Sequence, residues 1–213
     1  MAFWRRLRRK DSNELRNLEK MYKDKRKIIP ERFRRDFPEI SSLMPGDIIL
    51  AHSKKSVFGK LISLFTKSKF THAALYLGNG LIVESDKELR GVVVSPLVSY
   101  YDYKKHKLKA FRPKFLSEGK AMEIAEDVFG KVGSPYDFRQ IVGHAYRKIS
   151  SLIGVVREVP DAKNSFICTE LIAKAFEKST GKRFHPEIDA KNLTPADLDK
   201  FFEASPESFG RVY

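Results

Sequence analysis

The chain has 213 residues, 42% of them hydrophobic, and a formal net charge of +14, which is enough apolar material for one domain with its own core. Its single cysteine excludes an intrachain disulfide, and the lack of an 18-residue apolar run excludes a transmembrane helix. No apolar stretch follows the basic first ten residues, so we expect no standard secretory signal.

The positive charge is concentrated at the N-terminus, where residues 1–40 carry 14 Lys and Arg against 7 Asp and Glu. Apolar residues at helical intervals predict a mostly exposed helix over residues 11–28. Pro30 and Pro38 then mark an irregular connector. We therefore expect two parts, a basic helical extension over residues 1–40 and a main domain over residues 41–213.

Three interpretations of this extension stay open. Its cations, together with Phe3, Trp4 and Leu7, suit an anionic membrane surface. The charge alone would also suit nucleic acid, while the simplest interpretation is a solvated helix that packs on the main domain through residues such as Tyr22. Because no nucleic-acid motif occurs elsewhere, we expect no nucleic-acid partner, and a cytoplasmic protein that is peripheral to the membrane where the extension binds it.

The first half of the main domain predicts strands. Short apolar runs bounded by turn residues occur five times, at residues 48–51, 71–77, 81–85, 91–94 and 108–111. The second and third runs are separated by Gly78-Asn79-Gly80, which is typical of a β-hairpin turn. Because these strands are joined by short connections, an antiparallel sheet is expected.

Helices are predicted between and after the strands. Amphipathic spacing and capping residues indicate helical segments at residues 57–65, 117–129, 136–153, 168–178 and 194–198. The fold class is therefore α+β, with an antiparallel sheet or half-barrel packed against helices.

Cys168 is the first candidate for chemistry, because a short apolar run ending in this residue leads into a predicted helix. The positive end of a helix dipole favours a thiolate over a thiol, although an isolated cysteine is more often an inert core residue. A cysteine nucleophile also needs a base within hydrogen-bond reach and a group that orients the base. His72 begins an apolar strand, and Glu84 is a lone carboxylate on the return strand of the same hairpin. The two side chains are expected side by side across the ladder, where the alternative is a purely structural pair.

The other four histidines are weaker candidates for the base. His106 lies in a charged stretch that we expect to be exposed, His144 lies within a predicted helix, and His185 lies in a loop. His52 closes the first strand and is kept as a reserve. One cysteine and scattered histidines give no metal-ligand spacing, so we expect no metal and no cofactor.

Several segments resemble the circularly permuted papain-like superfamily, which includes NlpC-type cysteine peptidases and lecithin:retinol acyltransferase-like enzymes. The similarity lies in residues 45–50, 72–78, 84–85, 166–171 and 194–198. It is closest to the bacterial YiiX/YebB-like branch, in which the histidine strand precedes the cysteine helix as it does here. The similarity extends over about residues 43–200, so the resemblance implies a permuted papain-like fold for the main domain and nothing for residues 1–40.

The resemblance implies Cys168 as nucleophile, His72 as base and Glu84 as the orienting third residue. It also implies that Tyr136 and Thr169 contact the substrate, although the alternative for Tyr136 is a core residue below the helix. The expected activity is that of a cysteine hydrolase that forms a thioester acyl-enzyme on a small amide or peptide substrate. A lipid-directed acyltransferase or phospholipase-like enzyme and a non-catalytic binding module are the alternatives. The acyltransferase members have a second histidine where Glu84 stands, which argues against that assignment.

Overall fold

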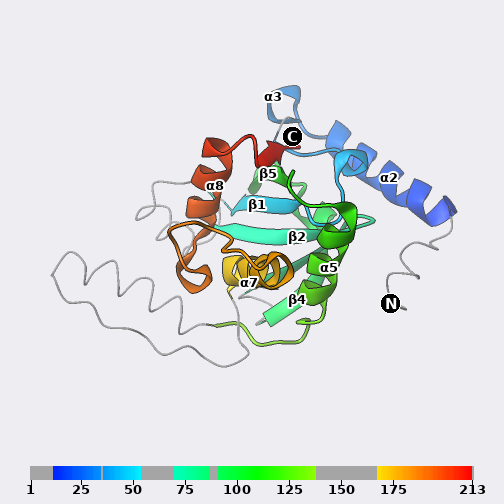
Figure 1. Ribbon diagram of the computed structural model, residues 1–213. Coiled ribbons are helices and arrows are strands. Elements are labelled where there is room, and N and C mark those ends of the chain that lie inside the picture. Colours follow the sequence, from blue (N-terminus) through cyan, green and yellow to red (C-terminus); the bar gives the residue numbers. More distant parts are fainter. Residues whose placement is uncertain (1–11, 35, 54–69, 87–90, 138–166, 213) are drawn as a thin grey trace.

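The computed structural model describes residues 12–34, 36–53, 70–86, 91–137 and 167–212 (Figure 1). Its centre is a six-stranded sheet in the order β4-β3-β2-β1-β5-β6, in which all neighbouring strands are antiparallel. The strands are β1 (Ile48–Ser53), β2 (His72–Gly78), β3 (Leu81–Asp86), β4 (Gly91–Pro96), β5 (His106–Pro113) and β6 (Phe209–Arg211). The α+β prediction is confirmed, and the sheet is open.

The five predicted strands are all present, and the hairpin between β2 and β3 turns where expected. Gly78, Asn79 and Gly80 all have positive φ angles, of 99°, 51° and 72°. Besides its positive φ angle, position 80 favours glycine for a second reason, since an added Cβ there would lie 2.9 Å from the ring of Tyr22. Strand β6 was not predicted, because three residues at the end of the chain give too short a pattern to read.

Three helices cover one face of the sheet, and together with it they form the larger core (Figure 1). They are α5 (Glu118–Phe129), α7 (Cys168–Thr180) and α8 (Pro195–Ala204). Their ends follow the predicted signals: the Ser117 side chain caps α5, Gly181 ends α7 with a φ of 68°, and Thr194 forms a capping box at α8. Phe111, Ile172 and Phe202 are among the fully buried side chains of this core.

The opposite face of the sheet is covered by the N-terminal extension, through α2 (Ser12–Lys27) and residues on both sides of the short helix α3 (Glu31–Arg34). Tyr22 on α2 is 2% exposed, and its hydroxyl donates a hydrogen bond to the Gly80 carbonyl at 2.9 Å. Ile29 and Phe37 are buried in the same cluster, in which the Phe37 ring packs against that of Tyr101. From Tyr22 onward, the extension therefore supplies part of the core.

Some predictions concern residues outside the described part of the chain. The helix expected over residues 57–65 and most of the helix expected over residues 136–153 belong to this group. At the start of the latter the prediction is wrong, since Pro135 forms a β-bridge with Gly91 and Tyr136 is not helical. Among the described residues, no helix combines the length and the apolar character that a membrane span requires.

Candidate active site

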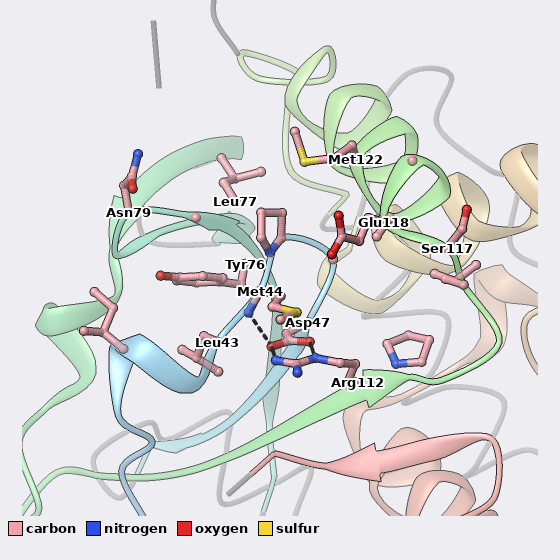
Figure 2. Close-up of a pocket in the computed structure, with 18 of the residues that line it drawn as sticks. Leu43, Met44, Asp47, Tyr76, Leu77, Asn79, Arg112, Ser117, Glu118 and Met122 are labelled. Carbon is pink, nitrogen blue, oxygen red and sulfur yellow. Dashed lines mark hydrogen bonds and ion pairs between the residues drawn. The ribbon is translucent and has the colours of Figure 1, made fainter. Parts of the chain in front are cut away.

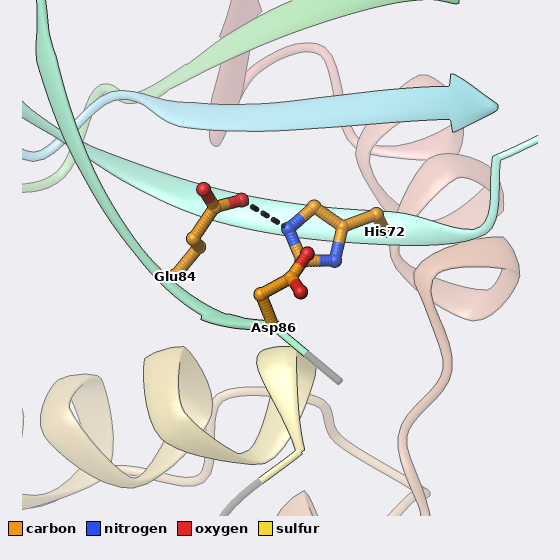
Figure 3. Close-up of side chains that lie close together, drawn as sticks. All are labelled: His72, Glu84 and Asp86. Atoms are coloured by element: carbon orange, nitrogen blue, oxygen red, sulfur yellow. Dashed lines mark hydrogen bonds and ion pairs between the residues drawn. The ribbon is translucent and has the colours of Figure 1, made fainter. Parts of the chain in front are cut away.

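His72 and Glu84 meet at the open end of the β2–β3 hairpin (Figure 3). Their side chains are joined by a hydrogen bond of 2.6 Å between His72 Nε2 and Glu84 Oε2. The register corrects one expectation, because Ala74 and not His72 lies directly opposite Glu84. Continuing that register by two residues places Asp86 opposite His72. Glu84 therefore reaches the imidazole along the diagonal of the ladder, a distance that a long side chain can span.

Glu84 is held as a carboxylate in a buried position, with 3% of its side chain exposed. Burial raises its pKa, but hydrogen bonds from His72, Ser95 and Tyr100 and the positive charge of His72 outweigh burial and lower the pKa to about 2. Because Glu84 is ionised near neutral pH, Nε2 of His72 carries a proton and donates it. This fixes the tautomer of the neutral imidazole and leaves Nδ1 as its basic nitrogen.

Cys168 is the first residue of α7 and is 7% exposed. The residue before it, Ile167, has extended backbone angles and no side-chain cap, so the first backbone N–H groups of α7 have no side-chain partner from the N-cap. Burial lowers the pKa of His72, but hydrogen bonds with Cys168 and Glu84 outweigh burial and raise the pKa well above its ordinary value. His72 thus lies between a sulfur and a carboxylate, with a contact to each.

This arrangement has the parts that nucleophilic catalysis by a thiol requires. His72 can take the Cys168 proton, and Glu84 stabilises the imidazolium that results. The positive end of α7 and its first N–H groups favour negative charge, both on the sulfur and on an oxygen bonded to the attacked carbon. The three residues predicted from the sequence are therefore brought together.

The two residues predicted to contact substrate are placed differently from each other. Tyr136 lies near Cys168, since its pKa is raised first by burial and next by the charge of that sulfur. Thr169 is fully buried, and its hydroxyl donates a hydrogen bond of 2.5 Å to the Leu193 carbonyl. That contact attaches the start of α7 to the 3-10 turn η3 (Ala190–Asn192), so Thr169 has a structural partner in this state of the protein.

Sequence reasoning missed three further residues of the site, namely Ser95, Tyr100 and Asp86. Ser95 and Tyr100 donate hydrogen bonds to Glu84, and the Asp86 carboxylate lies beside the imidazole (Figure 3). The sequence carries a weak signal for Tyr100, because it stands in a tyrosine-rich stretch in the connection between two predicted strands. The expectation that His106 is exposed was wrong, since it is half-buried and its ring centroid lies 5.1 Å from that of Tyr100.

His72, Glu84 and Asp86 are also the residues that could hold a metal ion in the described part of the chain, with ligand atoms within 4.8 Å of one another. Two of these ligand atoms already share a proton in the His72–Glu84 hydrogen bond. A cation would have to replace that proton, and it would remove the base that the neighbouring thiol needs. We therefore interpret the group as acid–base machinery.

A cavity of about 720 Å³ lies at the other end of the sheet, between the start of β1 and α5 (Figure 2). Its wall contains an ion pair in which Arg112 donates two hydrogen bonds to Asp47, at 2.8 and 2.7 Å. Asp47 also accepts a hydrogen bond from the Met44 backbone N–H, at 2.8 Å. These contacts fix the turn before β1, and the cavity is not lined by Cys168 or His72.

Comparison with known proteins identifies one family. Its sequence model, described as a permuted papain-like amidase enzyme of the YaeF/YiiX type, family C92, matches residues 42–200. The matched segment contains β1 to β5, α5, α7 and the start of α8, and with them every residue of the site described above. A search of curated proteins found no match.

Proposed function

The chain belongs to the permuted papain-like amidase family of the YaeF/YiiX type, and from this membership we propose that it is a cysteine amidase whose nucleophile is Cys168. His72 is the general base and acid, and Glu84 orients it. The observation that carries the proposal is the chain of contacts in which His72 bonds both to Cys168 and to a buried, ionised Glu84.

The proposed reaction has two stages. In the first, the Cys168 thiolate attacks the amide carbonyl carbon, and the C–N bond breaks as His72 gives its proton to the departing amine. The product of this stage is a thioester on Cys168. In the second stage His72 removes a proton from water, whose oxygen attacks the thioester and releases a carboxylic acid and the thiol. Backbone N–H groups at the start of α7 stabilise the oxyanion in both stages.

An amide is preferred over a lipid ester as the substrate. The family is one of amidases, and the third residue here is a glutamate where the acyltransferase-like enzymes have a second histidine. A carboxylate at this position keeps His72 protonated near neutral pH more effectively than a histidine does, so a proton is available for a poor leaving group such as an amine. Acyl transfer and a non-catalytic binding module are the outcomes that would contradict the proposal.

Alkylation with iodoacetamide tests the nucleophile directly, because Cys168 is the only cysteine in the chain. We expect the rate at pH 6–7 to exceed that of a free thiol, and His72→Ala to abolish the excess. His185→Ala is the matched control, since His185 is a half-exposed histidine whose Nδ1 only accepts backbone hydrogen bonds.

Intact-mass measurement after incubation with p-nitrophenyl acetate tests the acyl-enzyme. The wild-type protein should gain one acetyl group, and Cys168→Ala should gain none. A free-thiol alkylation rate that His72→Ala leaves unchanged, combined with no mass shift, would favour a binding module over an enzyme.

We also propose that α2 binds an anionic membrane surface. Its exposed face carries Arg16, Lys20, Lys23 and Lys27 at intervals of three and four residues, which places them in one stripe. Asp24 interrupts the stripe and pairs with Lys27 at 3.3 Å on the surface. Ile28, the residue after α2, is 73% exposed and offers an apolar contact next to these cations.

Charge reversal on this stripe is a better test than truncation. Removing residues 1–40 would take Tyr22 and Phe37 out of the core, so loss of binding would have two explanations. We expect the triple variant Lys20→Glu, Lys23→Glu and Lys27→Glu to bind phosphatidylglycerol vesicles with an affinity about 100-fold lower, at about 1 kcal/mol per removed cation. Vesicle flotation measures this affinity. Equal binding of the wild type and the triple variant, or stronger binding to RNA than to vesicles, would contradict the membrane assignment.

A further inference from the structure

Tyr100 contacts both members of the His72–Glu84 pair. It is the last residue of η2 (Leu97–Tyr100), the 3-10 turn that follows β4. Its hydroxyl lies 2.6 Å from Glu84 Oε2, the same oxygen that His72 Nε2 contacts at 2.6 Å. Its ring is nearly parallel to the imidazole, with 9° between the planes and 6.1 Å between the centroids.

The direction of the Tyr100–Glu84 hydrogen bond is fixed by the two acidities. Burial, followed by the negative charge of Glu84, raises the pKa of Tyr100 far above its ordinary value. Glu84 titrates near pH 2, so it accepts and Tyr100 donates at every pH at which the protein would work. One carboxylate oxygen therefore receives two charge-assisted hydrogen bonds, from the tyrosine and from the histidine.

We propose that Tyr100 is a positioning residue for the Cys168–His72 pair: its hydroxyl fixes the Glu84 carboxylate, and its ring restricts rotation of the imidazole. This inference rests on the proposed function, since it assumes that His72 serves Cys168. Glu84 reaches His72 only along the diagonal of the ladder, so its long side chain needs a second contact to hold one rotamer. Tyr100 supplies that contact from a turn outside the hairpin.

The hydroxyl also modulates the basicity of His72. Its positive hydrogen points at the carboxylate that stabilises the imidazolium, so it withdraws part of that stabilisation from His72. In Tyr100→Phe the ring remains but Glu84 loses this donor, and the imidazolium becomes more stable. The pH at which the Cys168–His72 pair loses its proton should therefore rise.

The test is the pH profile of Cys168 alkylation by iodoacetamide in the full-length protein. Its alkaline limb reports the loss of the His72 proton, and Tyr100→Phe should move that limb upward by about half a pH unit or more. Turnover of p-nitrophenyl acetate should fall about tenfold in kcat with little change in KM, because Glu84 and the imidazole are no longer held in one orientation.

The adjacent tyrosine provides a matched control. Tyr101 is buried where Tyr100 is half-buried, and its hydroxyl also donates one hydrogen bond, but to the backbone carbonyl of Pro38 and away from Glu84. Tyr101→Phe should lower the melting temperature as Tyr100→Phe does and should leave the alkaline limb unchanged. In a Glu84→Gln background, Tyr100→Phe should no longer move the limb.

The possible results separate the two proposals. If the wild-type alkylation profile does not depend on His72, the proposed function fails and the role of Tyr100 fails with it. If the profile depends on His72 but Tyr100→Phe leaves the limb in place, only the role of Tyr100 is refuted. An equal shift in Tyr101→Phe, or a shift that persists with Glu84→Gln, would also refute it, since the effect would then come from general packing.

Discussion

Replacing Glu84 with glutamine should change how the stability of the protein depends on pH. The pKa of Glu84 is about 2 in the folded protein against an ordinary value of 4.5, and each unit of difference corresponds to about 1.4 kcal/mol. The ionised carboxylate therefore contributes about 3 kcal/mol to the free energy of unfolding at neutral pH. A lowered pKa means that this contribution is complete above pH 4.5 and is lost as the pH falls toward 2. About 2 kcal/mol of it should be gone at pH 3.

Urea unfolding of the wild type and of Glu84→Gln at pH 3, 4, 5 and 7 measures this contribution. The variant should be less stable at pH 7 by about 2–3 kcal/mol, because the amide still accepts hydrogen bonds but has no charge to pair with His72. The difference should shrink as the pH falls below 4.5. Glu126→Gln, on an exposed position of α5, is the control and should show no such trend.

A constant difference between wild type and Glu84→Gln from pH 7 to pH 3 would refute this reasoning. It would mean that Glu84 has the same pKa in the folded and unfolded protein, and that the His72 contact adds nothing specific to the carboxylate. The pKa of His72 is raised, so its share of the same interaction is complete below pH 6.5 and disappears at higher pH. The loss of stability at low pH and the loss at high pH both come from the one His72–Glu84 ion pair, so the two contributions are not to be added.

Three substitutions outside the group of Cys168, His72 and Glu84 test individual hydrogen bonds of the fold. Asp47→Asn should cost about 1–3 kcal/mol in urea unfolding, because it removes the charge from a buried carboxylate that receives two hydrogen bonds from Arg112; an unchanged midpoint would contradict this. Thr169→Val should lower the free energy of unfolding by about 1–3 kcal/mol, because the Leu193 carbonyl loses its donor. The rate at which iodoacetamide alkylates Cys168 should stay unchanged, and a fall in that rate would indicate that Thr169 has a role in the site. Thr194→Ala should cost about 1 kcal/mol through loss of the capping box, measured by thermal denaturation, and a cost near zero would mean that the cap adds nothing to α8.

Local patterns were sufficient to predict most of the described elements. The hairpin turn at residues 78–80, the Ser117 cap and the glycine after α7 each depend on a few neighbouring residues, so short-range physics fixes them. Packing of Tyr22 on the main domain was one interpretation of the sequence, but its partner was not predicted, because a loop from a different part of the chain presents the Gly80 carbonyl to its hydroxyl. Strand β6 likewise depends on a distant partner, since it pairs with the end of β5.

Sequence spacing alone does not identify which carboxylate orients the imidazole of His72. Glu84 and Asp86 lie two residues apart on the same face of β3, so either could be the partner of His72. The strand register favours Asp86, which continues the ladder directly opposite the histidine, yet Glu84 makes the 2.6 Å contact. What favours Glu84 is its burial together with the donor from Tyr100, which arrives from a turn 16 residues later. Both donors meet on one oxygen of Glu84, so the residue that orients His72 is selected by the tertiary structure and not by the hairpin alone.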